Sequence, residues 1–563
     1  MKKQCKPAFF LIMNVLLIFN LLAYFSIRSM WSGIIRYTIK PMPYILLAIL
    51  TVTTLTVTIL SMHKKRPAFV SVWAGIINTL FLVLNTFIIA ITINSNHYFI
   101  REFCYGLLYI GIIATIIALV TVIPKIAWLQ NRWVHSILLV VLFVSGLFIV
   151  LDISLFNSID KTPVVYAVGD TYQITFTTQA KGEAWITIDG IEFNDTYAGY
   201  RKAETTIHKI SVPMELLDKT GEYTVYTRSM LLRGPYESLQ GETISQTYNW
   251  KGVNEEDGIN YYVISDTHNT SKAPLAAASY FGEALDFLIC CGDTASWIDR
   301  EEDLTEFLYL ASDITKGEIP VIYARGNHET KGVKAHELYN YVGANGQDFY
   351  YTFRLGSIWG IVLDIGEDHR DEYEEYSGVA KFNLYRMAQI EFLDEVLANA
   401  ENEFDAEGVE HRIAICHIPI TVKYTNDHAG AFKDSWLKRL NKMKLTMLYG
   451  GHVHELWYID PEFTDDMLLT QVMEYSGKIE DNSQRIMTKA KFPAILVSKR
   501  GDTQSPLDEE RIFDTDFIGL AVTVEEEETV MKYTDEEGNV LETRSPWFSD
   551  IVYGYEIRVP NIK

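Results

Sequence analysis

The pattern of apolar and polar positions separates residues 1–152 from the rest of the chain. Five long apolar runs without Asp, Glu, Lys or Arg lie there: Ala8–Ile27, Pro43–Met62, Ala68–Ile93, Phe103–Ile123 and Val134–Leu151. Each has about 20 residues, the length an α-helix needs to cross a hydrocarbon core of roughly 30 Å. Buried helices of a globular protein are the alternative. Five such runs in succession nevertheless favour a five-helix transmembrane region.

Basic residues around these runs predict an orientation in the membrane. With the N-terminus inside, the inner segments carry eight Lys or Arg residues and the outer segments carry four, which favours that orientation. Five crossings then place everything after Leu151 outside the cytoplasm. The first run is also compatible with a signal peptide, but no clear cleavage site follows it, so we expect it to be retained. Because no span is charged, we expect an anchor, with sensing or presentation of a lipid substrate as alternatives.

From about Thr162 to Val253, apolar and polar residues alternate. Three alternating segments, separated by turn signals such as Lys181-Gly182, Asp189-Gly190 and Thr220-Gly221, are Tyr172–Phe176, Ala184–Ile188 and Tyr223–Thr227. Short strands at this spacing predict a small β-sandwich, similar to immunoglobulin or fibronectin domains, over residues 160–253. We expect it to serve as a spacer or docking module. His208 is a lone histidine, and we expect it on the surface rather than in a ligand set.

From Asn260 onward, short apolar runs alternate with helical patterns, and polar residues follow each run. Five runs predict buried strands: Tyr261–Ser265, Phe287–Cys291, Val321–Arg325, Arg412–Cys416 and Leu445–Tyr449. The residues that follow them are Asp266-Thr267-His268, Gly292-Asp293, Gly326-Asn327-His328-Glu329, His417, and Gly450-Gly451-His452-Val453-His454. Sites form at the carboxyl ends of strands in α/β sheets, because the loops converge there. Later strands are predicted at Ala494–Ser498, Phe517–Val524, Thr529–Thr534 and Val540–Arg544, and we expect them to form the second sheet of this domain.

Composition and charge support a division of the chain. Its 563 residues are 48% hydrophobic, which is too apolar for a disordered chain, and five Cys cannot make a disulfide framework. Residues 1–152 hold twelve of the 49 Lys and Arg but two of the 72 Asp and Glu, so their charge is +10 and that of the remainder is −33. An acidic outer portion argues against nucleic acid as a partner. A multipass chain without disulfides suits a bacterial cell membrane.

Taken in order, the strand-end motifs resemble those of the calcineurin-like metallophosphoesterase superfamily over about residues 260–460. The resemblance implies that residues 254–563 form an α/β sandwich of two mixed sheets flanked by helices, with two bound metal ions. One metal would be held by Asp266, His268, Asp293 and His454. The other would be held by Asp293, Asn327, His417 and His452, so that Asp293 bridges the two ions. His328 and Asp293 would be the catalytic residues, with His328 off the metals and facing the phosphate.

The chemistry of phosphoester hydrolysis is compatible with this ligand set. Two cations neutralise the phosphate and lower the pKa of a bridging water, so that a hydroxide can attack phosphorus in line. Imidazole and carboxylate together suit Mn, Fe or Zn, whose identity stays open. His328 can protonate the leaving alkoxide or stabilise the transition state. The sequence therefore predicts a membrane-anchored, metal-dependent phosphoesterase (a phosphoric ester hydrolase) acting on phosphate monoesters or diesters.

A receptor or transporter subunit that binds a phosphorylated ligand without turnover is the alternative function. Because every ligand position of the motif is filled, we favour the enzyme. Phosphate monoesters, diesters, nucleotides and lipid head groups all fit such a site, and the anchor brings the lipid bilayer into reach as a partner. The oligomeric state stays open.

Several polar residues near the motifs leave alternatives open. Purple acid phosphatases carry a tyrosine ligand where this chain has Ser296, which argues against an Fe(III)–tyrosinate centre. Protein Ser/Thr phosphatases share Arg325, but they carry Gly-Asp-x-Val-Asp-Arg-Gly where this chain has Gly292-Asp-Thr-Ala-Ser-Trp297, which argues against that group. A polar insertion, Gly366–Gly378, precedes a helical pattern at Leu384–Leu397. Residues in or near loops that could form either a substrate rim or a solvated surface are Asp364, His369, Arg370 and His428. The acidic run Asp371–Glu375 is expected to be solvated, and Cys290, Cys291 and Cys416 are expected to be free thiols in the core.

Overall fold

The structure, a computed structural model, describes residues 158–561 apart from 198–200, 234–237, 374, 377, 425–426, 464–467, 472–473, 476–477, 480–482, 488–489, 498–515 and 545–550. Ser154–Lys563 form one compact unit. The transmembrane region predicted over residues 1–152 lies outside the described residues. Searching the described part of the chain finds no helix whose length and apolarity would let it span a bilayer.

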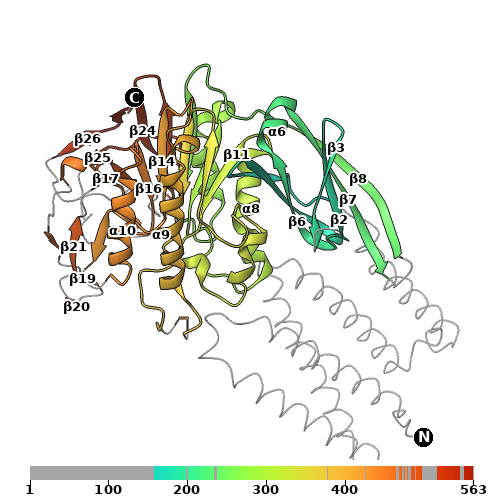
Figure 1. Ribbon diagram of the computed structural model, residues 1–563, viewed down its shortest axis with the longest axis horizontal. Helices are drawn as coiled ribbons and strands as arrows, with labels where there is room; N and C mark the ends of the chain where they lie inside the picture. The colour runs from blue at the N-terminus through green and yellow to red at the C-terminus, as the bar shows by residue number, and fades with distance from the viewer. Residues whose placement is uncertain are drawn as a thin grey trace, which may run out of the picture. The chain divides into compact units, whose positions relative to one another are not determined.

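Twelve strands form the first sheet, in the order β27-β24-β23-β9-β10-β11-β1-β2-β7-β8, with β3 and β6 also paired to β2 (Figure 1). At its centre, β9, β10, β11 and β1 are parallel, and β23 and β2 flank them in antiparallel orientation. The strands are β27 (Ile557–Pro560), β24 (Glu528–Asp535), β23 (Ile518–Val524), β9 (Ile259–Ile264), β10 (Phe287–Cys291), β11 (Pro320–Ala324), β1 (Val164–Val168), β2 (Thr171–Ile188), β7 (Glu222–Arg233), β8 (Ser238–Asn249), β3 (Ile191–Asn194) and β6 (Thr205–Pro213).

The second sheet has six strands in the order β12-β13-β14-β16-β22-β17. Its strands β13, β14, β16 and β22 are parallel. They are β12 (Tyr351–Leu355), β13 (Ile358–Val362), β14 (His411–Ile415), β16 (Met447–Gly450), β22 (Ala494–Leu496) and β17 (Trp457–Ile459). Smaller sheets contain β4 (Thr196–Tyr197), β5 (Arg201–Lys202), β15 (Val422–Tyr424), β18 (Leu468–Gln471), β19 (Glu474–Tyr475), β20 (Lys478–Ile479), β21 (Ser483–Met487), β25 (Thr543–Arg544) and β26 (Val552–Gly554).

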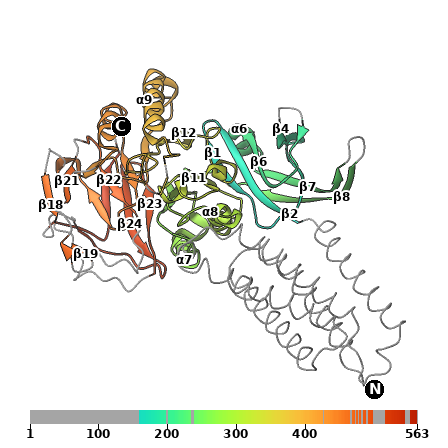
Figure 2. The same cartoon turned by 90° about the horizontal axis from the view of Figure 1, so that it is seen from below.

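Helices pack on the outer faces of the two sheets (Figures 1 and 2). Helices α7 and α8 contact strands of the first sheet, whereas α9 and α10 lie side by side on the second. The helices are α6 (Met214–Thr220), α7 (Lys272–Ala278), α8 (Glu301–Thr315), α9 (Phe382–Ala398) and α10 (Gly430–Leu440), and the 3-10 turns are η3 (Ser279–Ala284), η4 (His328–Thr330), η5 (Ala335–Asn340), η6 (Ala400–Asn402) and η7 (Pro461–Phe463). Two mixed sheets with flanking helices are the α/β architecture that the sequence predicted for this domain.

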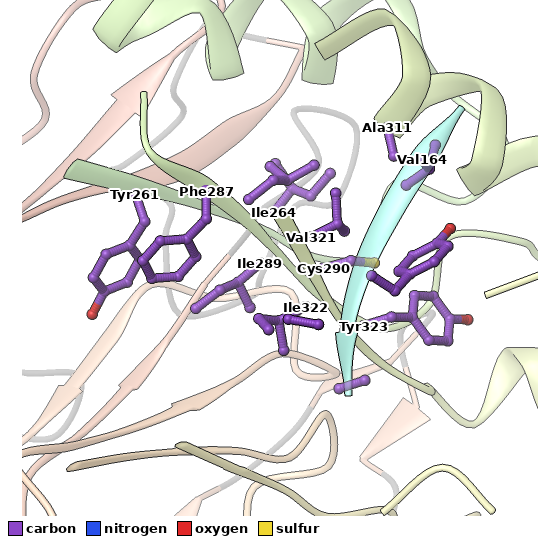
Figure 3. Packing of buried hydrophobic residues seen from close by; sticks show 14 of the residues in the cluster. Val164, Tyr261, Ile264, Phe287, Ile289, Cys290, Ala311, Val321, Ile322 and Tyr323 are labelled. Atoms are coloured by element: carbon purple, nitrogen blue, oxygen red, sulfur yellow. The ribbon is translucent and has the colours of Figure 1, made fainter. Parts of the chain in front are cut away.

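Alternating side chains divide the buried residues into two cores. In β14, Ile413 and Ile415 face the core shared by the two sheets, while Ala414 packs under α9 and α10, because successive side chains of a strand point to opposite faces. Figure 3 shows the first core, in which Val164 of β1 lies near Ala311 of α8. The five strands predicted from apolar runs before residue 450 are thereby confirmed as β9, β10, β11, β14 and β16, and the predicted helix as α9.

The alternating strands of residues 160–253 do not form a separate sheet. They extend the first sheet, because β1 pairs in parallel with β11 and continues into β2 through an antiparallel pairing. All five residues of β1 are buried, and a continuous apolar run of this kind is typical of a strand covered on both faces. The turn predicted at Lys181-Gly182 does not interrupt the chain, because β2 continues through these residues. Only the register of β2 with β6 shifts, between Thr177 and Gly182. The segment therefore differs from a detachable spacer, which would need a closed sheet of its own.

Two further sequence predictions need correction. Only β22 of the late strands joins the second sheet; β23 and β24 join the first, through the pairing of β23 with β9. His208 is fully buried rather than on the surface, with Nδ1 3.0 Å from Oδ2 of Asp195. In the first case the sequence identified the strands correctly but not their pairing partner. In the second case the ring lies against Phe176, which covers it.

Candidate metal centre

Three neighbouring strands of the first sheet deliver polar side chains to one edge. Strands β9, β10 and β11 are parallel and in register, so their carboxyl ends meet. Asp266 follows β9, Asp293 follows β10, and Asn327 follows β11. All three residues are at most 5% exposed. Buried carboxylates and amides need partners, because their desolvation is costly.

The second sheet brings imidazoles to the same place. His417 follows β14, and His452 and His454 follow the parallel neighbour β16. Nε2 of His417 lies 3.0 Å from Oδ2 of Asp293, and Nε2 of His454 lies 3.3 Å from Oδ1 of Asp266. The carboxyl ends of parallel strands from both sheets therefore converge on one site.

The backbone around the site is unusual, since five of these polar residues have positive φ angles. They are Asp266 (53°), His268 (43°), Asp293 (53°), His452 (73°) and His454 (54°). Residues other than glycine rarely adopt this region, and such strain collects at functional sites. Gly326 has no room for a side chain either, because a Cβ there would overlap Oδ1 of Asp293.

Among the described residues, ligand atoms form four groups that could each hold a metal ion, and one of these groups (Glu367, Asp368 and His369) lies in the polar insertion. In the first, Asp266, His268 and His454 approach one another, with the two Nε2 atoms of the histidines 3.1 Å apart. In the second, Asp293 lies with His417 and His452. Nδ1 of His452 is 3.1 Å from Oδ1 of Asn327. Asp293 also groups with His268 and His328, which places it between the two sets.

His417 provides a test of whether a cation fits. Its Nδ1 lies 2.6 Å from the carbonyl oxygen of Cys291, to which only an N–H can donate. Its Nε2 is buried, faces Oδ2 of Asp293, and has no well-directed hydrogen bond among the described residues. Burial lowers the pKa of His417, but the carboxylates of Asp293 and Asp266 raise it to about 10. The same negative field attracts a metal ion, so the donor set fits one.

Comparison with known families agrees with this geometry. Residues 259–456 match the family of calcineurin-like phosphoesterases. These residues form a calcineurin-like metallophosphoesterase domain. No curated protein matches the chain.

Solved structures that are similar to the chain share little sequence with it. The purple acid phosphatase PPD1 from yellow lupin (Lupinus luteus) seeds is 14% identical, over 67% of this chain and 72% of that one, with a TM-score of 0.42. PhoD is 13% identical over 68% and 88%, with a TM-score of 0.37. GAP50, the anchor in the inner membrane complex of Plasmodium, is 13% identical over 55% and 90%, with a TM-score of 0.34. Scores this low carry no functional comparison.

His328 of the metallophosphoesterase domain points toward the site from its more open side. Its backbone N–H donates to Oδ1 of Asp293 over 2.9 Å, and its Nδ1 lies 2.8 Å from the carbonyl oxygen of Ser296. Its Nε2 is 3.9 Å from Oδ2 of Asp293, and the side chain is 32% exposed. The group of Ser296 that contacts His328 is thus its backbone carbonyl.

Glu329 holds the loops of the metallophosphoesterase domain together, a role that the sequence analysis did not assign. It accepts hydrogen bonds from the backbone N–H groups of Asp293 (2.9 Å), Thr294 (2.5 Å), Ala295 (2.9 Å) and Gly326 (2.8 Å). The carboxylate is 1% exposed. It therefore ties the loop after β10 to the loop after β11. The fourth residue of Gly-Asn-His-Glu was the available signal, since a buried acid beside ligands needs several donors.

Residues 364–368 bring two further acids to the site that the sequence analysis missed. Oε2 of Glu367 lies 3.3 Å from Nδ2 of Asn327, and Oδ2 of Asp368 lies 3.5 Å from Nε2 of His452. Glu367 is 1% exposed. The signal in the sequence is the polar insertion itself, Gly366–Gly378, which contains both acids.

The residues expected at a substrate rim or on a solvated loop differ in their burial and contacts. Asp364 is buried and paired with Arg325 at 2.7 Å, so it is neither a rim nor a solvated residue. His369 is exposed and stacks on Tyr373. Arg370 and His428 are exposed, which is compatible with a rim and with a solvated loop. The prediction that Asp371 is solvated is wrong, because its side chain is buried and accepts a hydrogen bond from the N–H of Phe382.

The expected core thiols are confirmed. Cys290, Cys291 and Cys416 are free and buried.

Proposed function

We propose that the chain is a membrane-anchored phosphoesterase that holds two metal ions and hydrolyses phosphate monoesters or diesters. The observation that carries the proposal is the position of Asp293, whose carboxylate groups with ligand atoms on both sides. Asp266, His268, Asp293 and His454 would hold one ion, and Asp293, Asn327, His417 and His452 the other. Mn, Fe and Zn all suit these nitrogen and oxygen donors.

Metal ions bound there would neutralise the phosphoryl oxygens and acidify a water molecule. The chain's own residues supply the rest of the mechanism. His417 is held with Nε2 toward Asp293 by its contact with Cys291. His328 is held by Ser296 at Nδ1, so Nε2 is the atom that can transfer a proton to the leaving oxygen. Its partial exposure leaves room for substrate on that side.

The activity is tested on the full-length protein purified in detergent with Mn²⁺. An aryl phosphate monoester and a bis-aryl phosphate diester report the released phenol. We expect Asp293→Asn and His328→Asn to lower turnover by about 100-fold or more, in the range lost with an acid or base catalyst. Asp257→Asn and His336→Asn are the matched controls, since both side chains are exposed and outside the site. Wild-type protein that binds inorganic phosphate without turning over either substrate would support the receptor alternative instead.

The membrane anchor and the extracytoplasmic position of the domain rest on the apolar runs and the distribution of Lys and Arg. A membrane-impermeant maleimide tests both in intact cells. Glu372→Cys introduces a thiol at an exposed position of the domain, and we expect labelling without permeabilisation. Lys64→Cys, in a predicted inner segment, should be labelled only after permeabilisation. The reverse pattern would contradict the proposed orientation.

A further inference from the structure

His452 has different neighbours at its two ring nitrogens. Nδ1 lies 3.1 Å from Oδ1 of Asn327, its companion in the second candidate ligand group. The side-chain N–H of Asn327 donates to Glu367 over 3.3 Å, and this partner identifies which atom of the amide is the oxygen. Nε2 of His452 lies 3.5 Å from Oδ2 of Asp368. The ring is thus placed between the metal position and a carboxylate.

This placement selects one tautomer when Nδ1 binds a metal ion. A neutral imidazole carries one proton, so a ligating Nδ1 leaves that proton on Nε2. A carboxylate facing Nε2 accepts from that N–H, which fixes the orientation of the ring and makes Nδ1 a stronger donor to the metal. Asp368 is in the position where such an acceptor is needed.

The loop that carries Asp368 is held in place by buried side chains of α9. Gln389 accepts from the N–H of Asp364 over 2.9 Å and donates to its carbonyl over 2.6 Å. Arg386 donates to the carbonyl oxygens of Ile365, over 2.9 Å, and of Glu367. Arg386 and Gln389 are both 0% exposed. Burying a guanidinium is costly unless it has hydrogen-bond partners. The carbonyl oxygens of this loop are such partners, so the side chain of Arg386 fixes the loop conformation.

We propose that Asp368 is a positioning residue for the second metal ion, acting through His452, and that Arg386 and Gln389 hold its loop. The inference rests on the proposed two-metal function. A change at Asp368 should therefore affect metal binding at one position and leave the other position unchanged. Asp368 faces His452, whereas the other position is built from Asp266, His268 and His454.

Metal binding by the full-length protein in detergent tests this without relying on activity. Titration calorimetry with Mn²⁺ measures each site, and electron paramagnetic resonance separates a coupled Mn pair from a single ion. For Asp368→Asn we expect one site to weaken by about 10- to 100-fold, the usual effect of losing such a partner, and the other to keep its affinity. With two equivalents of Mn²⁺ per protein, the paramagnetic resonance signal of a coupled Mn pair should be replaced by the signal of a single Mn²⁺ ion. Glu372→Gln, which removes an exposed acid of the same insertion, should leave both sites unchanged.

The possible results separate the two levels of the proposal. Two unchanged sites in Asp368→Asn, or two sites weakened equally, would overturn the positioning role. Asp368→Glu should recover part of the lost affinity, because it restores the carboxylate; affinity no better than that of Asp368→Asn would also count against the role. A wild-type protein that binds fewer than two Mn²⁺ ions would overturn the two-metal function itself, and the positioning role with it.

Discussion

The two sheets contribute different chemistry to the same site. The first sheet supplies mainly oxygen donors, from Asp266, Asp293 and Asn327, whereas the second supplies imidazoles, from His417, His452 and His454. Neither main ligand group is complete within one sheet: His454 completes the group of Asp266 and His268, and His417 and His452 complete the group of Asp293. The packing of one sheet against the other therefore sets the distances between ligands.

The sheets also differ in how far they extend. The first has twelve strands and the second has six, and the difference comes largely from residues 164–249, which lengthen the first sheet beyond β11. These added strands touch the second sheet as well, since the N–H of Gly169 donates to the carbonyl oxygen of Thr352 in β12 over 2.8 Å. The upstream segment thus supports both sheets, although it lies outside the matched family region.

The largest expected effect follows from removing this extension. A chain of residues 254–563 lacks β1, which leaves the edge of β11 unpaired and uncovers the residues beneath Val164. Burying each large apolar side chain contributes about 1.5–3 kcal/mol, and native domains are stable by only about 5–15 kcal/mol. We therefore expect no cooperative thermal unfolding transition for residues 254–563 by circular dichroism.

The matched control for that truncation is residues 158–563, which keeps every described strand and should unfold cooperatively. Equal melting temperatures for the two chains would show that the upstream strands are a spacer after all.

A smaller effect is expected from the acid that joins the loops of the first sheet. Glu329→Gln leaves one side-chain oxygen to face four backbone N–H groups and turns an amide toward some of them. Hydrogen bonds to charged groups contribute about 1.5–3 kcal/mol each. We expect urea unfolding to show a loss of about 2–4 kcal/mol, together with weaker Mn²⁺ binding.

Glu403→Gln provides the comparison beside the second sheet, because the carboxylate of Glu403 accepts a hydrogen bond from the indole of Trp359 in β13 over 2.8 Å. It should lose about 1 kcal/mol and retain metal binding. Equal losses of unfolding free energy and of Mn²⁺ binding in the two variants would contradict a special role for Glu329.

Features of the site encoded by local patterns could be predicted from the sequence. A short apolar run followed by Asp, Asn or His marks a buried parallel strand and its carboxyl end, and this pattern brought together Asp266, Asp293 and His417 correctly. Features set by distant partners could not be predicted. Asp368 reaches His452 because Arg386 and Gln389, on a later helix, hold its loop, and no periodicity records that contact.

Strand pairing was unpredictable for the same reason. The sequence of Phe517–Val524 predicts a strand but does not indicate that its partner is β9, some 260 residues earlier. The run Val164–Val168 did carry a signal of its own, because five consecutive apolar residues indicate a strand buried on both faces. That run indicates a strand in a sheet covered on both faces, but it does not indicate that β11 is its partner.

The smallest effect concerns a hydrogen bond between the sheets. The hydroxyls of Tyr261 in β9 and Tyr449 in β16 are 2.6 Å apart, and both side chains are fully buried. Tyr449→Phe leaves the hydroxyl of Tyr261 buried without this partner, which costs about 1–3 kcal/mol. Replacing both tyrosines leaves no unpaired hydroxyl, so we expect the double variant to lose less than the sum of the two single variants in urea unfolding.

Tyr533→Phe is the control for this coupling, because Tyr533 also reaches from the first sheet to the second, donating to the carbonyl oxygen of Leu496 over 2.6 Å. It shares no hydrogen-bond partner with Tyr449, so its effect should add to that of Tyr449→Phe. Additive losses for Tyr261 and Tyr449 would mean that their hydroxyls do not depend on each other. Apolar packing alone would then hold the two sheets in register at this point.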